Sequence, residues 1–300
     1  MEQPLRHLIA PHSETEFFDH FEKNLPLVAH DLGDGIRELT DLPFLSSLDA
    51  LLQSWPDTID AYLPGVADEG NSRAISVREA PERFRDGTGL LFNDVQAVSP
   101  VLERWLESLR NELGLSALTL GRNLVYAIPA GAGTAPHFDQ NINFVLQLHG
   151  TKTWRVAPNG HVERPMSRYV IGLPTEAELA TYSKSPMPGT LPPDAAEFVL
   201  HPGSLLFVPR GAWHATEAIT DSISVNFTYT VPTWIDLLTV TLRSRLALSS
   251  AWRESAVIGR DRNSAGETAL KLDALVSEAV RDMQSWNGAD ILAVTEGGRR

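Results

Sequence analysis

Pro136-His137-Phe138-Asp139-Gln140 places a histidine and an aspartate two residues apart in a stretch that favours a β-strand. Side chains alternate between the two faces of a sheet, so we expect His137 and Asp139 to point to the same side. Far downstream, Pro209-Arg210-Gly211-Ala212-Trp213-His214 carries another histidine, after an apolar run and a Pro-x-Gly turn. An imidazole delivered from this second strand would complete a ligand set of two nitrogens and one carboxylate oxygen.

The predicted ligand set has the composition of the facial triad of non-haem Fe(II) oxygenases. That triad leaves coordination positions open for a chelating co-substrate and for dioxygen. The His-x-Asp tripeptide alone is a weak signal, and a single histidine such as His214 is more often an exposed loop residue. The context strengthens the prediction, because Pro136 and two nearby glycines precede the tripeptide and strand-forming residues follow it. We therefore expect an iron site formed by His137, Asp139 and His214.

A β-hairpin is predicted just after this stretch, with residues 143–148 and 151–156 joined by the turn His149-Gly150. Cross-strand partners share a face, so this pairing groups Asn143, Val145, Gln147, Lys152 and Trp154 on one side. A lysine beside a buried tryptophan is costly unless an anion neutralises it, and a dicarboxylate co-substrate would do so. The alternative is a solvated face on which Lys152 is an ordinary surface lysine.

The pattern of residues 119–232 predicts a mainly β core with flanking helices. Short apolar runs separated by glycine and proline are typical of an antiparallel barrel or a double-sheet jelly roll. Residues 222–230 alternate strictly, and their polar side is predicted to face either solvent or a polar cavity. Residues 174–193 are predicted to form a long excursion, with residues 181–193 as a candidate lid, and residues 64–72 an exposed loop.

Helical periodicity flanks the β core on both sides. Ser13 and Glu16 have the spacing of a capping box at a helix N-terminus, and residues 100–113 form a second amphipathic pattern preceded by a capping serine. Apolar residues return to helical spacing after Thr233. We expect an oxygenase domain over residues 1–231, including N-terminal helices, and a helical segment over 232–300. The apolar stripe of that segment either packs on the barrel or forms a homodimer interface.

The composition of the 300 residues excludes several classes of site and partner. There is no cysteine, which excludes disulfides, cysteine-based zinc sites and thiol nucleophiles. Lys plus Arg total 25 against 38 Asp plus Glu, giving a net charge of −13. This charge argues against direct nucleic-acid binding and is compatible with a basic protein or peptide partner. The sequence shows no signal-peptide pattern and no apolar run of the ~18 residues that a membrane span needs, so we expect a cytoplasmic protein without membrane contact.

Four passages together resemble the JmjC and cupin-like Fe(II)/2-oxoglutarate oxygenases, whose core is a double-stranded β-helix. Within that group the sequence is most similar to the bacterial and human ribosomal-protein hydroxylases and to the asparaginyl hydroxylase called factor inhibiting HIF. The first passage resembles the helix that opens the ribosomal hydroxylases, and the others resemble strands that carry the metal and co-substrate residues. The four passages are Glu16–Leu27, Pro136–Val156, Gly203–His214 and Val225-Asn226-Phe227.

The resemblance implies a role for each candidate site residue. His137, Asp139 and His214 would bind Fe(II), and Trp213 would form a wall beside the last of these ligands. The distal carboxylate of 2-oxoglutarate would pair with Lys152. The further positions that the resemblance assigns to the co-substrate are Thr134, Asn143, Asn226 and, through its hydroxyl, Tyr126.

Departures from the family leave the substrate open. The bacterial ribosomal hydroxylases carry arginine at the position of Lys152. Residues 154–201 match no segment of these relatives. The stretch after Val231 is also too short for their dimerisation helices plus winged-helix module.

The resulting hypothesis is an Fe(II)- and 2-oxoglutarate-dependent dioxygenase. It would consume O2, hydroxylate an amino-acid side chain of a protein, a peptide or a free amino acid, and release succinate and CO2. One alternative is a JmjC-type N-methyl demethylase with the same iron chemistry, and Asp139 in place of glutamate favours hydroxylation over it. The other alternative is a metal-binding cupin that is not an oxygenase. An interior Lys152 argues against such a cupin, because it has no need of a buried cation.

Overall fold

Two β-sheets form the core of the protein in the computed structural model, which describes residues 3–56, 58–258 and 262–295. The eight-stranded sheet contains, in spatial order, β1 (Leu27–Ala29), β12 (Leu205–Val208), β8 (Ile142–His149), β14 (Ser222–Thr230), β6 (Leu120–Ile128), β5 (Thr88–Phe92), β2 (Thr58–Pro64) and β4 (Arg73–Ser76). The six-stranded sheet contains β10 (Tyr169–Val170), β7 (Gly133–Phe138), β13 (Trp213–Ala218), β9 (Lys152–Ala157) and β11 (Ala196–Leu200), with β3 (Val66–Ala67) parallel to β7.

The two sheets pack face to face, because single apolar clusters contain side chains from both. Val145 of β8 and Leu206 of β12 pack with Trp154 and Val156 of β9 across the interior. Every residue of β14 except the last is buried, including the polar ones, so its polar side lines the interior rather than solvent. The predicted mainly β fold with a double-stranded β-helix core is confirmed.

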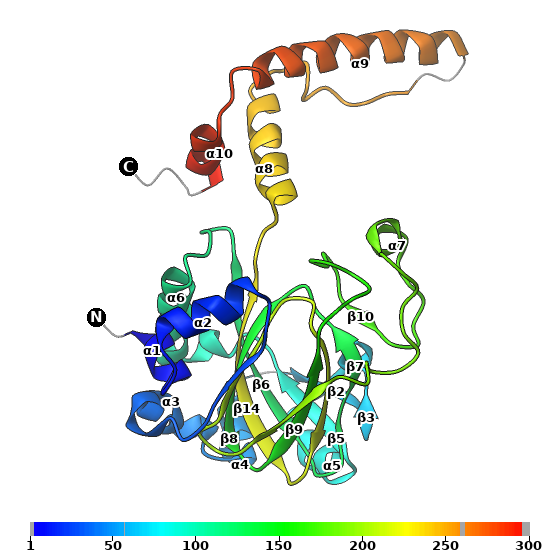
Figure 1. The fold of residues 1–300 in the computed structure, drawn as a ribbon. Coiled ribbons are helices and arrows are strands. Elements are labelled where there is room, and N and C mark those ends of the chain that lie inside the picture. The colour runs from blue at the N-terminus through cyan, green and yellow to red at the C-terminus, as the bar shows by residue number, and fades with distance from the viewer. Residues whose placement is uncertain (1–2, 57, 259–261, 296–300) are drawn as a thin grey trace. The chain divides into compact units, whose positions relative to one another are not determined.

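Two helices in the first half of the chain begin where the sequence pattern predicts. Ser13 caps the second helix and Ser99 caps the sixth, each by accepting a hydrogen bond from a backbone N–H three residues ahead. The apolar side of the sixth helix is buried, and α1, α2 and α6 group together in Figure 1. The helices are α1 (Pro4–Ile9), α2 (Glu14–Glu22), α3 (Arg37–Thr40), α4 (Leu48–Ser54), α5 (Ala80–Arg85), α6 (Pro100–Glu112), α7 (Ala177–Tyr182), α8 (Trp234–Leu246), α9 (Arg262–Met283) and α10 (Gly288–Thr295), with 3-10 turns η1 (Gly33–Ile36), η2 (Pro43–Leu45), η3 (Glu69–Asn71) and η4 (Val95–Val98).

The predicted hairpin between residues 143–148 and 151–156 is wrong. Strand β8 pairs with β12 and β14, whereas β9 pairs with β11 and β13 in the other sheet. Gly150 (φ +67°) does not close a hairpin turn here. A Cβ at this position would lie 1.9 Å from the carbonyl oxygen of Asp221, so a glycine is needed where the connection after β8 passes close to the one before β14. The predicted grouping of side chains nevertheless holds, because both strands turn the same residues toward the interior between the sheets.

The predicted loop at residues 64–72 is exposed or half-exposed where its burial is described, but it is not without regular structure. It contains β3, which pairs with Gly133 and Thr134 of β7, and the short turn η3. Three further strands that the sequence pattern did not predict, β2, β4 and β5, extend the larger sheet beyond β6. The excursion at residues 174–193 contains α7, whose buried Leu179 packs in a cluster with Phe138. The lid role of residues 181–193 stays a prediction.

The chain consists of two compact units. Unit 1 comprises Met1–Leu115 and Leu120–Thr230, and unit 2 comprises Ser116–Thr119 and Val231–Arg300. Unit 2 contains α8, α9 and α10, and α8 begins with a complete capping box between Thr233 and Asp236. No helix within the described ranges has both the length and the apolar composition that crossing a lipid bilayer requires.

Candidate active site

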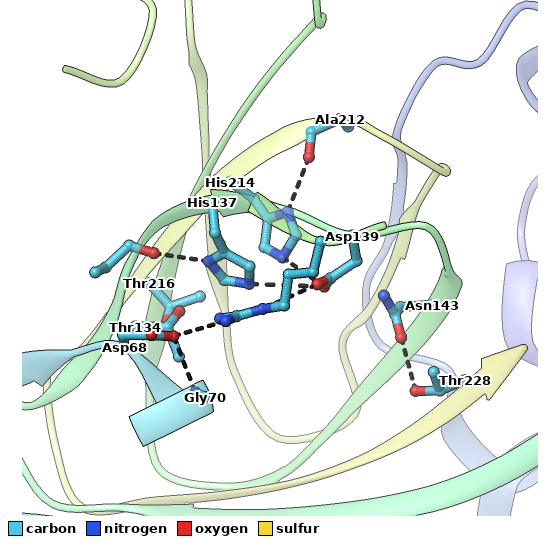
Figure 2. A network of polar contacts seen from close by, with 12 residues as sticks. Asp68, Gly70, Thr134, His137, Asp139, Asn143, Ala212, His214, Thr216 and Thr228 are labelled. Atoms are coloured by element: carbon cyan, nitrogen blue, oxygen red, sulfur yellow. Dashed lines mark hydrogen bonds and ion pairs between the residues drawn. The ribbon is translucent and has the colours of Figure 1, made fainter. Parts of the chain in front are cut away.

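His137, Asp139 and His214 converge on one point, as Figure 2 shows. The first two lie at the end of β7, and the register of β13 sets His214 directly opposite His137. The Nε2 atom of each histidine lies 3.6 Å from Oδ2 of Asp139. One ligand atom from each of the three residues lies within 4.8 Å of the others, so the group can hold one metal ion.

Backbone carbonyl groups set the tautomer of both imidazoles. Nδ1 of His137 donates a hydrogen bond to the carbonyl oxygen of Ala135 at 2.7 Å, and Nδ1 of His214 donates one to Ala212 at 2.9 Å. A neutral imidazole that carries its proton on Nδ1 has a free lone pair on Nε2, which is the form that binds a metal. Two such nitrogens and one carboxylate oxygen fit Fe(II), and this site corresponds to the facial triad expected from the sequence.

Burial and nearby charges keep Asp139 and His214 in their metal-binding protonation states. Burial lowers the pKa of His214 to about 3, and the neighbouring His137 adds to this effect. Burial alone would raise the pKa of the Asp139 carboxyl, but the electrostatic influence of His137, His214 and Arg168 outweighs burial and holds that pKa below its usual range. The carboxylate is therefore ionised and the His214 imidazole neutral around neutral pH.

The pKa of His214 predicts how the stability of the metal-free protein depends on pH. The imidazole takes up a proton below about pH 6.5 in the unfolded chain but only below about pH 3 in the folded one. Between these values the unfolded state binds more protons, so the free energy of unfolding should fall on acidification by up to ~1.4 kcal/mol per pH unit. Chemical denaturation of metal-free protein between pH 7 and pH 4 measures this slope. We expect a shallower slope for His214→Gln, and equal slopes would contradict the assignment.

A cavity of about 170 Å³ opens beside the triad. Its walls come from both sheets and from the segment that follows β9. The residues that line it are Leu124, Tyr126, Thr134, His137, Asp139, Gln140, Asn141, Asn143, Lys152, Trp154, Arg168, His214, Thr216, Asn226 and Thr228. All eight residues that the sequence singled out for metal or co-substrate lie in this one cavity.

Lys152 is buried, with 2% of its surface exposed. Its ammonium nitrogen lies 5.6 Å from the centre of the Tyr126 ring and 5.4 Å from that of Trp154, so the aromatic faces stabilise its charge. Trp154 in turn stacks on the ring of His214 at 5.7 Å. The interpretation of Lys152 as a solvated surface lysine is therefore wrong.

The expected wall beside His214 is formed by Trp154 and not by Trp213. Trp213 precedes the ligand on β13, so the alternation of side chains directs it to the opposite face of the sheet. There it is fully buried against Phe138 and Tyr169.

Polar side chains that line the cavity together with Lys152 are only partly hydrogen-bonded within the protein. The hydroxyl oxygens of Thr134 and Thr216 lie 2.9 Å apart, and Thr228 donates to Oδ1 of Asn143 at 2.6 Å (Figure 2). Among the described residues, Oδ1 of Asn226 has no hydrogen-bond partner although it is buried. A buried polar atom without a partner is costly, so this cavity suits a small polar ligand.

Two charged residues of the site escaped the sequence analysis. Arg168 lines the cavity, and it forms an ion pair with Asp139 and a 2.6 Å hydrogen bond to Asp68. Asp68 lies in the segment that was predicted to be an exposed loop, and Arg168 lies in the segment that matched no relative. No local pattern marks either residue, because the hydrogen bond joins positions 100 residues apart.

Comparisons with known proteins agree with this fold. Residues 106–237 match the model of the JmjC domain. The uncharacterized protein YxbC of Bacillus subtilis is 30% identical over 92% of this chain and 86% of its own length. Ribosomal oxygenase 1 of Gallus gallus is 28% identical over 81% of this chain, which spans only 39% of that relative. The structure of YcfD, a ribosomal oxygenase from Escherichia coli solved with cobalt and 2-oxoglutarate, has a TM-score of 0.53 at 15% identity, covering 89% of this chain and 67% of that one.

The chain therefore belongs to the JmjC-domain family, which is the class of protein that its fold and site indicate. The donor set of His137, Asp139 and His214 is that of an Fe(II) site, which agrees with this class.

Proposed function

We propose that this protein is a 2-oxoglutarate-dependent dioxygenase that hydroxylates an amino-acid side chain of a protein, and that Lys152 anchors the distal carboxylate of 2-oxoglutarate. The observation that carries the proposal is the buried ammonium group of Lys152 in the same cavity as the three candidate metal ligands. A cation at this depth attracts an anion strongly, because little water screens it. A keto acid with a second carboxylate can reach the metal with one end and Lys152 with the other.

The protein's part in this reaction is to bind and orient the reactants and to exclude water. A bound Fe(II) would supply the chemistry, in which 2-oxoglutarate and O2 yield succinate and CO2 while one atom of O2 enters succinate and the other is inserted into a C–H bond of the substrate. His137, Asp139 and His214 would hold the ion. The Thr134 hydroxyl and the amides of Asn143 and Asn226 would orient the co-substrate.

The tyrosine and tryptophan beside Lys152 keep the inner end of the cavity dry. Tyr126 and Trp154 are both more than nine-tenths buried, and their rings lie against the ammonium group. Excluding water strengthens the attraction between ammonium and carboxylate and protects reactive species from side reactions. The proposed contribution of Tyr126 is therefore its ring as well as its hydroxyl.

A ribosomal protein is the substrate class that we propose first. The relatives named ribosomal oxygenases support it, since they match more than half of this chain. The net charge of −13 is compatible with a basic protein substrate. A cytoplasmic location is part of the same proposal.

Mass spectrometry tests this proposal directly. Ribosomal proteins from the host, prepared from cells that lack the enzyme, are incubated with the protein, Fe(II) and 2-oxoglutarate. The expected result is a gain of one oxygen atom on a defined residue, dependent on 2-oxoglutarate and absent with His214→Ala. Formaldehyde release with loss of a methyl group would instead identify an N-methyl demethylase. Succinate formation without any modified protein would direct the search to peptides and free amino acids.

Unit 2 is proposed to mediate homodimerisation. It exposes several large apolar side chains, including Trp234 (82% exposed) and Ile235 (61%) on α8 and Leu270 (70%) on α9. Apolar groups gathered on helices in this way mark interaction surfaces more often than free surfaces. Light scattering at micromolar concentration should give twice the mass of the chain, and Trp234→Glu with Leu270→Glu should halve it. The control Ile219→Glu changes an exposed apolar residue of unit 1 and should leave the mass unchanged; a monomeric wild type would exclude the dimer.

A further inference from the structure

Arg168 connects the candidate metal ligand Asp139 to a second carboxylate, Asp68. Its Nε lies 3.2 Å from Oδ1 of Asp139, and its Nη1 donates a 2.6 Å hydrogen bond to Oδ1 of Asp68. The three side chains are 24%, 14% and 12% exposed, respectively. Both carboxylates appear in Figure 2 next to the imidazoles. An ion pair this well shielded from water is held more firmly than one at the surface.

The guanidinium group contacts one particular oxygen of the ligand carboxylate. Oδ2 of Asp139 faces both imidazoles, at 3.6 Å from each Nε2, and Oδ1 faces Arg168. We infer that Arg168 is a positioning residue that holds Oδ1 of Asp139 so that only Oδ2 is presented to the metal, and that Asp68 holds Arg168 in place. A carboxylate free to rotate would bind the ion through both oxygens and occupy a position that the co-substrate needs.

The backbone fixes both partners of this arrangement to the strand that carries the metal ligands. Arg168 directly precedes β10, which pairs through Tyr169 and Val170 with Phe138 and His137 of β7. Asp68 directly follows β3, which pairs with the other end of β7. Its Oδ1 also accepts a 2.9 Å hydrogen bond from the backbone N–H of Gly70. The guanidinium group is therefore placed by rigid elements and not by a free loop, as precise support of a metal ligand requires.

If Arg168 acted only through its charge, removing it would strengthen metal binding. If Arg168 positions Asp139, removing it would weaken metal binding. Taking a cation away from the neighbourhood of a metal dication favours metal binding. Loss of alignment weakens it, and losing an outer partner of a metal ligand typically costs roughly 10–100-fold in affinity. Weaker metal binding by an Arg168 variant therefore cannot be an effect of charge. The inference rests on the proposed function solely in taking the triad as the metal site.

Titration of the metal-free full chain with Co(II), without co-substrate, tests this inference. Calorimetry gives the affinity and visible absorption reports the coordination of the ion. Arg168→Ala should weaken Co(II) binding by roughly 10–100-fold and change the absorption spectrum. Asp68→Asn, which is nearly isosteric, should weaken binding in the same direction by a smaller factor.

The double variant and a matched control separate positioning from a general structural effect. Because Asp68 acts through Arg168, Arg168→Ala combined with Asp68→Asn should bind Co(II) no more weakly than Arg168→Ala alone. Arg155→Ala removes an exposed arginine that pairs with Glu197 on the same sheet, and it should bind Co(II) as the wild type does. If Arg168→Ala fails to fold, as judged by thermal unfolding, Asp68→Asn decides the question on its own.

Two results would overturn the inference. The first is wild-type affinity and an unchanged spectrum in both Arg168→Ala and Asp68→Asn, which would leave the proposed function intact. The second is tighter Co(II) binding by Arg168→Ala, which would show that the guanidinium acts only through its charge. If the wild-type chain itself binds no Co(II), the proposed function fails together with the inference.

Discussion

Lys152→Ala is expected to raise the KM for 2-oxoglutarate by on the order of a hundredfold or more. Truncating one member of a buried charge pair costs about 2–5 kcal/mol, and each 1.4 kcal/mol corresponds to about a tenfold change. The ammonium group lies 5.4 Å from the centre of the Trp154 ring, in a cavity that contains the candidate metal ligands, so its loss removes the proposed anchor of the distal carboxylate. Succinate formation measured against 2-oxoglutarate concentration gives the KM.

Controls distinguish loss of the anchor from damage to the site. Co(II) affinity should stay close to that of the wild type in Lys152→Ala, because Lys152 is not among the metal ligands. Lys152→Arg keeps the positive charge, so its KM should rise less than that of Lys152→Ala. Lys23→Ala removes an exposed lysine paired with Asp19 on α2 and should leave the KM unchanged. An unaltered KM in Lys152→Ala would place the anion anchor elsewhere.

Asp139→Ala is expected to abolish succinate formation. The change removes the one carboxylate of the ligand set and leaves two imidazoles. Loss of a ligand's hydrogen-bond partner typically lowers metal affinity roughly 10–100-fold, so loss of the ligand itself should lower it by more. The change also removes the anion that Arg168 contacts at 3.2 Å. Calorimetric Co(II) titration and a succinate assay with saturating Fe(II) measure the two effects separately.

A surface aspartate provides the comparison for this second prediction. Asp19→Ala removes an exposed carboxylate that pairs with Lys23 on α2, and it should bind Co(II) and form succinate as the wild type does. Thermal unfolding of the metal-free variants shows whether either has lost its fold. If Asp139→Ala still turns over at an appreciable rate, Asp139 is not a metal ligand.

Local patterns in the sequence were sufficient to predict which side chains turn inward. The spacing of His137 and Asp139 placed both on one face of β7, and strict alternation in β14 placed Asn226 on the opposite face from Phe227. Helix starts were also predictable from local sequence, because the Ser99 side chain caps α6 by accepting a hydrogen bond from a residue only three positions away. The structure places all eight predicted site residues in one cavity, because each was chosen by its face or by its place in a family motif.

Strand partners, in contrast, were decided only by the tertiary structure. The face of a strand on which a side chain lies depends on the backbone within a few residues. The choice of the neighbouring strand depends on how distant segments close the two sheets. The predicted pairing of β8 with β9 therefore failed even though both strands bury the expected residues. The same reason explains why Asp68 and Arg168 were missed: their hydrogen bond spans 100 residues. The sequence alone identified the candidate metal ligands, and only the folded chain brought Arg168 and Asp68 to them.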